Sequence, residues 1–172
     1  MSNDQRCQPL SLDDVLDLVD RARAEGRTGL ARKSKAVDVR PARVGEVIVT
    51  VIAGEGKETQ SHPAAAGDWV VRNRIAETGE EQYLVDGGEF QERYRLADQP
   101  PGADGWRKAL PLGQTVRYFV VSPEQGEFSF GAPWGETMVA RPGDAIVQDH
   151  DNPRNIWRVA AVAFAGSYEL LR

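Results

Sequence analysis

An amphipathic pattern opens the chain. Apolar residues recur at intervals of three and four positions from Leu12 to Ala22, which is the period of one helix face. Ser11 and Asp14 have the spacing of a capping box, and Gly26 follows as a stop signal. The pattern predicts a helix over residues 12–25 that packs on a sheet or closes one end of a barrel, with a partner-binding helix as the alternative.

The rest of the chain consists of short apolar segments between polar turns, and two of its patterns occur twice. Gly67-Asp68 and Gly143-Asp144 each lead into an apolar strand, and they lie 76 positions apart. A Phe-x-x-x-Tyr pattern ends each copy, at Phe90 and again at Phe164, 74 positions later. The second copy is therefore two residues shorter, and the difference falls in a turn, where length changes cost least.

The repeat predicts a mainly β (α+β) fold of two tandem related units, each of about 75 residues, preceded by one N-terminal helix. The expected divisions are an N-terminal extension (1–30), a first unit (31–96), a linker (97–105) and a second unit (106–172). Arg32-Lys33 is matched with Arg107-Lys108 in this scheme, and the apolar segment 46–52 is matched with 115–121.

Within the first unit, alternation and turn residues predict strands at 37–40 and 46–52 and a hairpin of 69–72 with 82–85. A short helix is expected over 88–94, capped by Asp86. Asp68 and Asp144 each follow a glycine and are expected to shape a turn, with a catalytic role as the alternative.

These motifs resemble the uncharacterised PGDYG-like proteins, which include small proteins encoded by bacteriophages. The matching stretch is Pro142-Gly143-Asp144 with the strand after it, together with Trp157, Phe164 and Tyr168. Ala145 stands where an aromatic residue is usual, and Ala66 replaces the proline in the first copy. The resemblance implies a compact β-rich fold in a bacterial or phage protein, and it implies no activity.

Composition narrows the classes of partner. Hydrophobic residues make up 41% of the 172, enough for a core, and the formal net charge of −5 disfavours nonspecific binding to nucleic acid or to an anionic membrane. Basic residues at 32–43 and 72–95 keep nucleic acid as a minor alternative. Cys7 is the single cysteine, no apolar run has the length of a membrane span, and residues 1–6 lack the apolar region of a signal peptide. A cytoplasmic location is expected.

The sequence contains no pattern that indicates a metal or a cofactor. His62 and His150 lie in unlike surroundings, and Asp149-His150-Asp151 is expected to form a solvated turn. Neither a Gly-x-Ser-x-Gly elbow nor a phosphate-binding loop occurs. We therefore expect no cofactor and no metal site.

The segment 123–136 has no counterpart in the first copy by this alignment, and it combines aromatic with acidic residues. Departures from a repeat are places where specialised function is added, so the segment is a candidate binding loop. The alternative is a hairpin that covers the core. The candidate ligand-binding residues are Glu127, Phe128, Phe130, Trp134 and Glu136 of this segment, together with Asp68 and Tyr83.

Two functions remain open. The first is a non-catalytic binding or interaction module for a small molecule or a protein partner, with a small ligand held in a groove between the two units. The alternative is a cofactor-free cyclase, isomerase or hydrolase that uses carboxylates such as Asp68, Glu127 or Glu136 with Tyr83 or His62.

Overall fold

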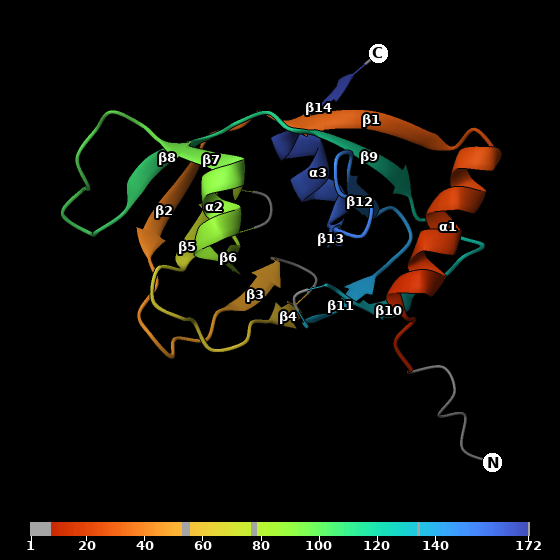
Figure 1. Ribbon diagram of the computed structural model, residues 1–172, viewed down its shortest axis with the longest axis horizontal. Helices are drawn as coiled ribbons and strands as arrows, with labels where there is room; N and C mark the ends of the chain where they lie inside the picture. The colour runs from red at the N-terminus through yellow and green to blue at the C-terminus, as the bar shows by residue number, and fades with distance from the viewer. Residues whose placement is uncertain (1–7, 53–55, 77–78, 134, 172) are drawn as a thin grey trace.

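The structure, a computed structural model, describes residues 8–52, 56–76, 79–133 and 135–171, and shows a mainly β fold with one N-terminal helix (Figure 1). The N-terminal part contains α1 (Leu12–Ala24), β1 (Thr28–Lys33), β2 (Val37–Pro41), β3 (Val49–Ile52), β4 (Gly56–Gln60), β5 (Trp69–Asn73), β6 (Gln82–Val85), α2 (Gly87–Arg93) and β7 (Tyr94–Leu96). The C-terminal part contains β8 (Arg107–Pro111), β9 (Thr115–Val120), β10 (Phe128–Gly131), β11 (Thr137–Ala140), β12 (Ala145–Asp149), β13 (Ile156–Val159), α3 (Ala161–Ser167) and β14 (Tyr168–Leu171).

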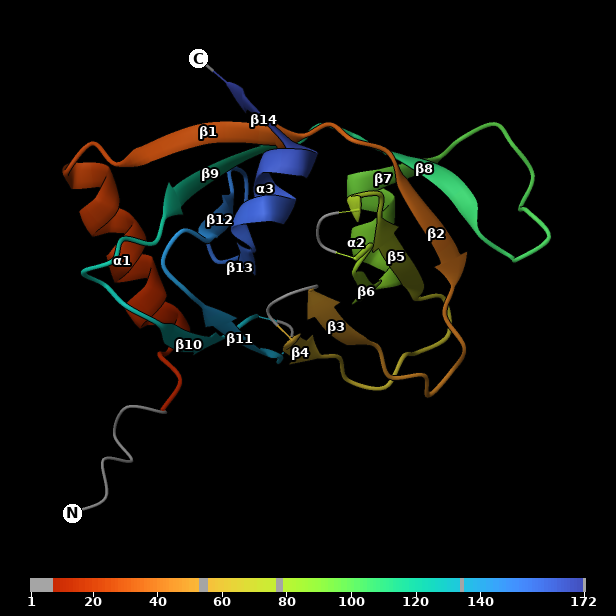
Figure 2. The same cartoon turned by 180° about the vertical axis from the view of Figure 1, so that it is seen from behind.

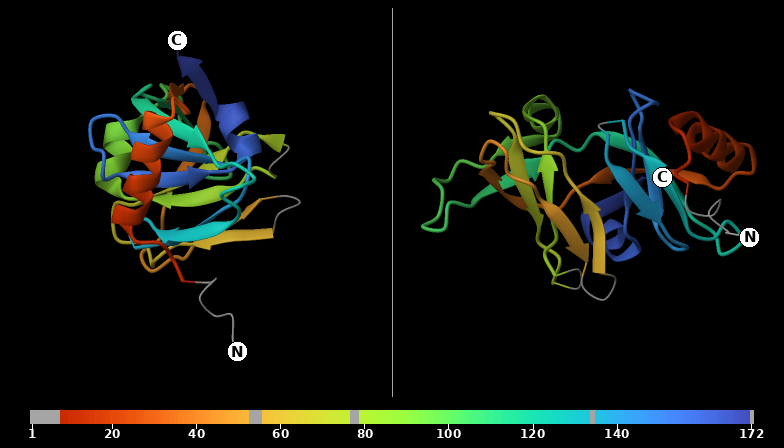
Figure 3. Two further views of the ribbon diagram at one scale, coloured as in Figure 1. Left: turned by 90° about the vertical axis from the view of Figure 1, so that its right-hand side faces the viewer. Right: turned by 90° about the horizontal axis from the view of Figure 1, so that it is seen from below.

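Helix α1 forms as its sequence predicts. The Ser11 hydroxyl accepts a hydrogen bond from the backbone N–H of Asp14 at 3.1 Å, and the Asp14 carboxylate accepts one from the N–H of Ser11 at 3.0 Å. Val15 and Val19 on its apolar face are buried in a core cluster with Phe119 of β9. The helix lies on the outer side of the C-terminal part, away from β2 and β8 (Figure 3).

Two five-stranded antiparallel sheets dominate the fold. The first sheet has the strand order β6-β5-β2-β8-β7, and the second sheet has the order β13-β12-β9-β1-β14. Two hairpins, β3–β4 and β10–β11, form separate two-stranded sheets, and β4 lies against β11. Each strand of the first sheet therefore has a counterpart at the same place in the second.

Each sheet contains one strand from the other part of the chain. Strand β1 leads into β2 of the first sheet, yet it pairs with β9 and β14 of the second sheet. Strand β8 leads into β9, yet it pairs with β2 and β7 of the first sheet. The links 34–36 and 112–114 carry the chain from one sheet to the other, as can be followed from behind in Figure 2. This exchange resembles a domain swap within one chain.

The backbone pairing corrects the predicted alignment of Arg32-Lys33 with Arg107-Lys108. Ala31 pairs with Val116 in the second sheet and Ala109 pairs with Val37 in the first, and both alanines are fully buried. By this register, Lys33 is the counterpart of Pro111, since each pairs with the tyrosine that follows its short helix. The sequence match aligned two charged dipeptides, whereas the buried alanines decide which residues face the core.

The predicted match of segment 46–52 with 115–121 is also wrong, because β9 occupies the place of β2. Strand β3 covers only Val49–Ile52, and its hairpin with β4 is the counterpart of the hairpin β10–β11. The hairpin within segment 123–140 thus corresponds in position to a hairpin of the N-terminal part. The two hairpins differ so much in sequence that an alignment by residue type cannot match them.

The Gly-Asp pairs act as turn residues in both sheets. The Asp68 carboxylate accepts hydrogen bonds from the N–H groups of Ala65 at 2.9 Å and Gly87 at 3.2 Å, and it is 4% exposed. Asp144 accepts from Arg141 at 2.8 Å and from Ala161 at 3.3 Å in the same way. Each aspartate thereby joins the turn before a strand to the first residue of the short helix that follows.

Stacked aromatic rings form the core beside each short helix. In the first sheet Trp69 stacks on Phe90 at 4.5 Å between ring centroids, and Phe90 stacks on Tyr94. In the second sheet Ala145 takes the place of Trp69, and Tyr118 of β9 contacts Phe164 instead, at 4.8 Å. A third ring thus completes each stack, although a different strand supplies it. Helix α2 begins after Asp86, which caps it as predicted, and ends at Arg93 rather than at residue 94.

Candidate functional site

A cavity of about 370 Å³ lies between the two sheets, and we call it the central cavity. Residues of both sheets and of both short helices line it, and α2 and α3 lie on opposite faces of the molecule (Figure 3). The volume falls at the lower end of the range of small-molecule sites in proteins. The charged and aromatic lining residues that matter most are Lys33, Tyr83, Arg93, Tyr94, Trp157 and Tyr168.

The aromatic lining follows the correspondence between the sheets, whereas several charged lining residues do not. Tyr83 of β6 corresponds to Trp157 of β13, and Tyr94 of β7 corresponds to Tyr168 of β14. Lys33 breaks the correspondence, because its counterpart in the first sheet is Pro111. The lysine therefore gives this cavity a charge that no symmetric pair of units would have.

The Lys33 ammonium lies among polar groups of the first sheet. Its Nζ atom donates to the hydroxyl of Tyr83 at 2.6 Å, to that of Tyr94 at 2.7 Å and to Oδ1 of Asn73 at 3.4 Å. The same atom lies 5.3 Å and 5.2 Å from the two tyrosine ring centroids, at the hydroxyl ends of the rings. Because β1 belongs to the second sheet, this cluster joins the two sheets across the cavity.

A buried amide connects this cluster to a carboxylate. Asn73 of β5 donates through Nδ2 to Oε1 of Glu81 at 2.6 Å while its Oδ1 accepts from Lys33. Glu81 is 6% exposed, and its charge partly offsets that of the lysine through the amide. Within the described residues, the hydrogen bonds of Lys33 thus go to neutral groups.

The phenols of Tyr83 and Tyr168 remain protonated at neutral pH. Burial raises the pKa of the Tyr83 phenol well above its usual value, and the adjacent Tyr94 raises it further. Burial also raises the pKa of the Tyr168 phenol, against the opposing effect of the Lys33 charge. These tyrosines are therefore hydrogen-bond donors and acceptors rather than bases.

Arg93 brings a second cation to the cavity. Its guanidinium lies 4.3 Å from the ring centroid of Trp157, and its Nη2 atom lies 3.5 Å from Oε2 of Glu89 in an ion pair. Among the residues that the structure describes, this buried Nη2 has no hydrogen-bond acceptor. Arg93 of α2 thus reaches across from the first sheet to an aromatic residue of the second.

Of the candidate residues named from sequence, two line the central cavity, Tyr83 and Glu136, and His62 lines it as well. Asp68 is a buried turn residue. Glu127 pairs with Arg141 at 3.0 Å, and its side chain is 59% exposed.

Phe128 and Phe130 share one face of β10, as their alternation predicts, but they pack beneath α1 in the core. The hairpin therefore covers the core, as the alternative interpretation of segment 123–136 held. Trp134 and Cys7 lie outside the described residues.

Sequence reasoning missed Lys33, Arg93 and Trp157 as site residues, and it treated Tyr94 and Tyr168 as structural. The available signal was the Phe-x-x-x-Tyr pattern, whose tyrosines both line the cavity. Nothing in the sequence indicates that Lys33 leaves its own unit.

His150 and Asp151 lie in an exposed turn, 3.4 Å apart, as expected. Within the described ranges, no group of three or more potential metal ligands is present, and no helix has the length and apolar character needed to cross a membrane.

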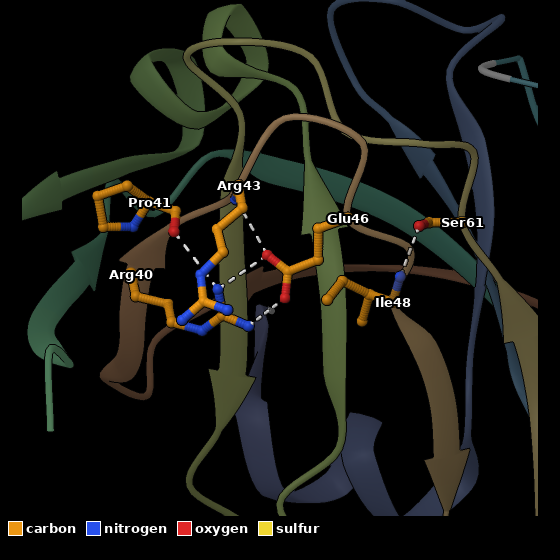
Figure 4. Close-up of polar contacts among 6 residues, drawn as sticks. All are labelled: Arg40, Pro41, Arg43, Glu46, Ile48 and Ser61. Atoms are coloured by element: carbon orange, nitrogen blue, oxygen red, sulfur yellow. Dashed lines mark hydrogen bonds and ion pairs between the residues drawn. The ribbon is translucent and has the colours of Figure 1, made fainter.

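The hairpin β3–β4 supplies Thr50 to the lining of the central cavity. Charged groups hold the loop that leads into this hairpin (Figure 4). Arg40 of β2 donates to both carboxylate oxygens of Glu46, at 3.0 Å and 2.7 Å, and the backbone N–H of Arg43 donates to one of them at 3.0 Å. These contacts lower the pKa of Glu46 to about 2. The hydroxyl of Ser61 accepts from the N–H of Ile48 at 2.9 Å and closes the other side of the loop.

We expect Glu46→Gln to remove a contribution to stability that depends on pH. A carboxylate with a pKa lowered from 4.5 to about 2 stabilises the fold fully above pH 4.5, and loses that effect as the pH falls toward 2. The full difference corresponds to about 3 kcal/mol, and solvent screening reduces it, so we expect a loss of about 1–2 kcal/mol at pH 7. Urea unfolding at pH 7 and pH 3 checks this, because the gap between variant and parent should narrow at pH 3. An equal gap at both pH values would contradict it.

Comparisons with known proteins found no similar protein. No protein-family model matches the chain, and neither a curated protein nor a solved structure is significantly similar to it.

Proposed function

We propose that this protein is a non-catalytic binding protein that holds a small molecule in the central cavity. The observation that supports this most is the cluster of Lys33, Tyr83 and Tyr94, which places a cation and two phenols at a cavity of about 370 Å³ between the sheets. Apolar walls with a few convergent polar groups are the usual composition of a ligand site. The position of the cavity between the two sheets supports the sequence-based prediction of a ligand groove between two units.

The chemistry of the tyrosines favours binding over catalysis. Raised pKa values keep Tyr83 and Tyr168 neutral at pH 7, so they donate hydrogen bonds without abstracting protons. Asp68, a candidate base, has its carboxylate committed to two backbone N–H groups. We also propose that the two sheets derive from a duplicated unit, which their equal strand order supports.

A cofactor-free enzyme remains the second candidate, because His62 and Glu136 line the same cavity. A ligand identified by binding would separate the two. An enzyme would convert it on prolonged incubation, and His62→Gln would abolish the conversion while leaving binding in place. A binding protein would return the ligand unchanged.

We expect a screen of small metabolites, grouped as anionic, neutral and cationic, to raise the melting temperature with at least one group. The matched variants are Val159→Phe, which fills the cavity from β13, and Val162→Phe, which places the same ring at an exposed position of α3. Val159→Phe should remove the shift and Val162→Phe should keep it. Shifts that survive Val159→Phe would place the ligand elsewhere, and no shift with any group would overturn the proposal in favour of a protein partner.

A further inference from the structure

In the hydrogen-bond cluster around Lys33, one phenolic O–H donor has no acceptor among the described residues. The three N–H bonds of the ammonium are used by Asn73, Tyr83 and Tyr94. The two phenol oxygens lie 2.9 Å apart, so one phenolic proton is shared between them. The other phenolic proton has no acceptor among the described residues, although Tyr94 is only 6% exposed. A buried donor without an acceptor is costly, and a bound ligand or water must supply one.

A further hydroxyl lines the same cavity as the two cations. Tyr168 is a lining residue together with Lys33 and Arg93, and the charges of both lower the pKa of its phenol. Arg93 adds the buried Nη2 atom described above, which has an ion-pair partner in Glu89 but no hydrogen-bond acceptor in the described part of the chain. This region thus has two cations and two donors without a hydrogen-bond acceptor in the described part of the chain, beside the carboxylates of Glu81 and Glu89.

The protein's own cations already contact these aromatic residues. Lys33 contacts the hydroxyl ends of Tyr83 and Tyr94, and Arg93 lies over the ring of Trp157. A cationic ligand would have to displace these groups and face like charge. Several carboxylates of the lining are engaged by the protein itself, since Asp86 caps α2 and Asp149 accepts from the N–H of Asp151.

Resting on the proposed function, we infer that the ligand of the central cavity carries an oxyanion, a carboxylate or a phosphate, which binds between Lys33, Arg93 and the hydroxyls of Tyr94 and Tyr168. An oxyanion supplies the missing acceptors and offsets the charge of Lys33, whose hydrogen bonds described above go to neutral groups. Such a site exists at Lys33 and not at the corresponding position of the first sheet, because that position is occupied by Pro111.

Four fluorinated probes of one size test the ligand class: 4-fluorobenzoate, 4-fluorophenyl phosphate, 4-fluorobenzamide and 4-fluorobenzylamine. Fluorine NMR gives the dissociation constant of each with the full chain. We expect at least one of the two anions to bind tenfold or more tightly than the amide and the amine, and to weaken as salt is raised. The better of the two anions distinguishes a carboxylate ligand from a phosphate ligand.

Matched variants locate the effect. Lys33→Met should weaken the anion tenfold or more and Tyr94→Phe several-fold, while Lys35→Met, the same change at an exposed position two residues away, should leave it unchanged. Circular dichroism confirms that each variant is folded, and Tyr94→Phe keeps the test valid if Lys33→Met does not fold. Equal binding of anionic and neutral probes, or anion binding that Lys33→Met and Tyr94→Phe leave intact, would overturn the inference. Neutral or cationic metabolites that bind in a Val159-dependent way would overturn it while leaving the proposed function in place.

Discussion

Asp144→Ala should lower the free energy of unfolding by about 3–5 kcal/mol, because it removes the carboxylate that pairs with the buried guanidinium of Arg158. Arg158 donates to this carboxylate from Nε at 2.8 Å and from Nη2 at 2.7 Å, with side chains 0% and 3% exposed. The same carboxylate holds the turn at Arg141 and the first residue of α3, Ala161. Urea unfolding monitored by circular dichroism measures the loss.

Arg158→Leu is the matched control, since Leu84 stands at the corresponding place in the first sheet. Asp68 there keeps its backbone hydrogen bonds with a leucine at this place, so a buried carboxylate in this turn is stable without the arginine. We expect Arg158→Leu to cost only about 1–2 kcal/mol. Equal losses in the two variants would contradict this, and would show that the arginine, not the turn, stabilises Asp144.

A fragment of residues 36–112 should fold by itself, whereas a fragment of residues 28–98 should not. The first contains β2 to β8 and therefore every strand of the first sheet, including Ala109 in its core. The second has nearly the same length and follows the unit boundary suggested by the sequence, but it lacks β8, the only strand that pairs with β7. Cooperative thermal unfolding of the first fragment alone is the expected result.

Strand β1 cannot substitute for β8 in the second fragment. If β1 took the place of β8, Ala31 would pair with Val37, and residues 32–36 would have to form the turn between the two strands. Lys33 would then lie in the turn instead of extending along β7, where Tyr94 needs a partner. Cooperative unfolding of both fragments would contradict this argument and show that β1 can fold back onto its own unit.

The sequence by itself determined the local features, because their causes lie within a few residues. The capping box of Ser11 and Asp14 sets the start of α1, the Gly-Asp pairs form their turns, and Asp86 caps α2. The hairpin of β5 with β6 is equally local. The mainly β class with one N-terminal helix followed from these patterns.

Only the tertiary structure decided which strands pair. A strand of period two presents the same backbone donors and acceptors to any neighbour, so nothing in β1 or β8 states that each completes the other sheet. That exchange carries Lys33 to Tyr83 and Tyr94, from which it is 50 and 61 residues away in sequence. It also explains why the alternation of Phe128 and Phe130 predicts a shared face correctly but cannot tell that α1, and not a ligand, covers it. The central cavity exists because residues distant in sequence meet between two sheets, and long-range pairing of this kind is a property of the packed chain.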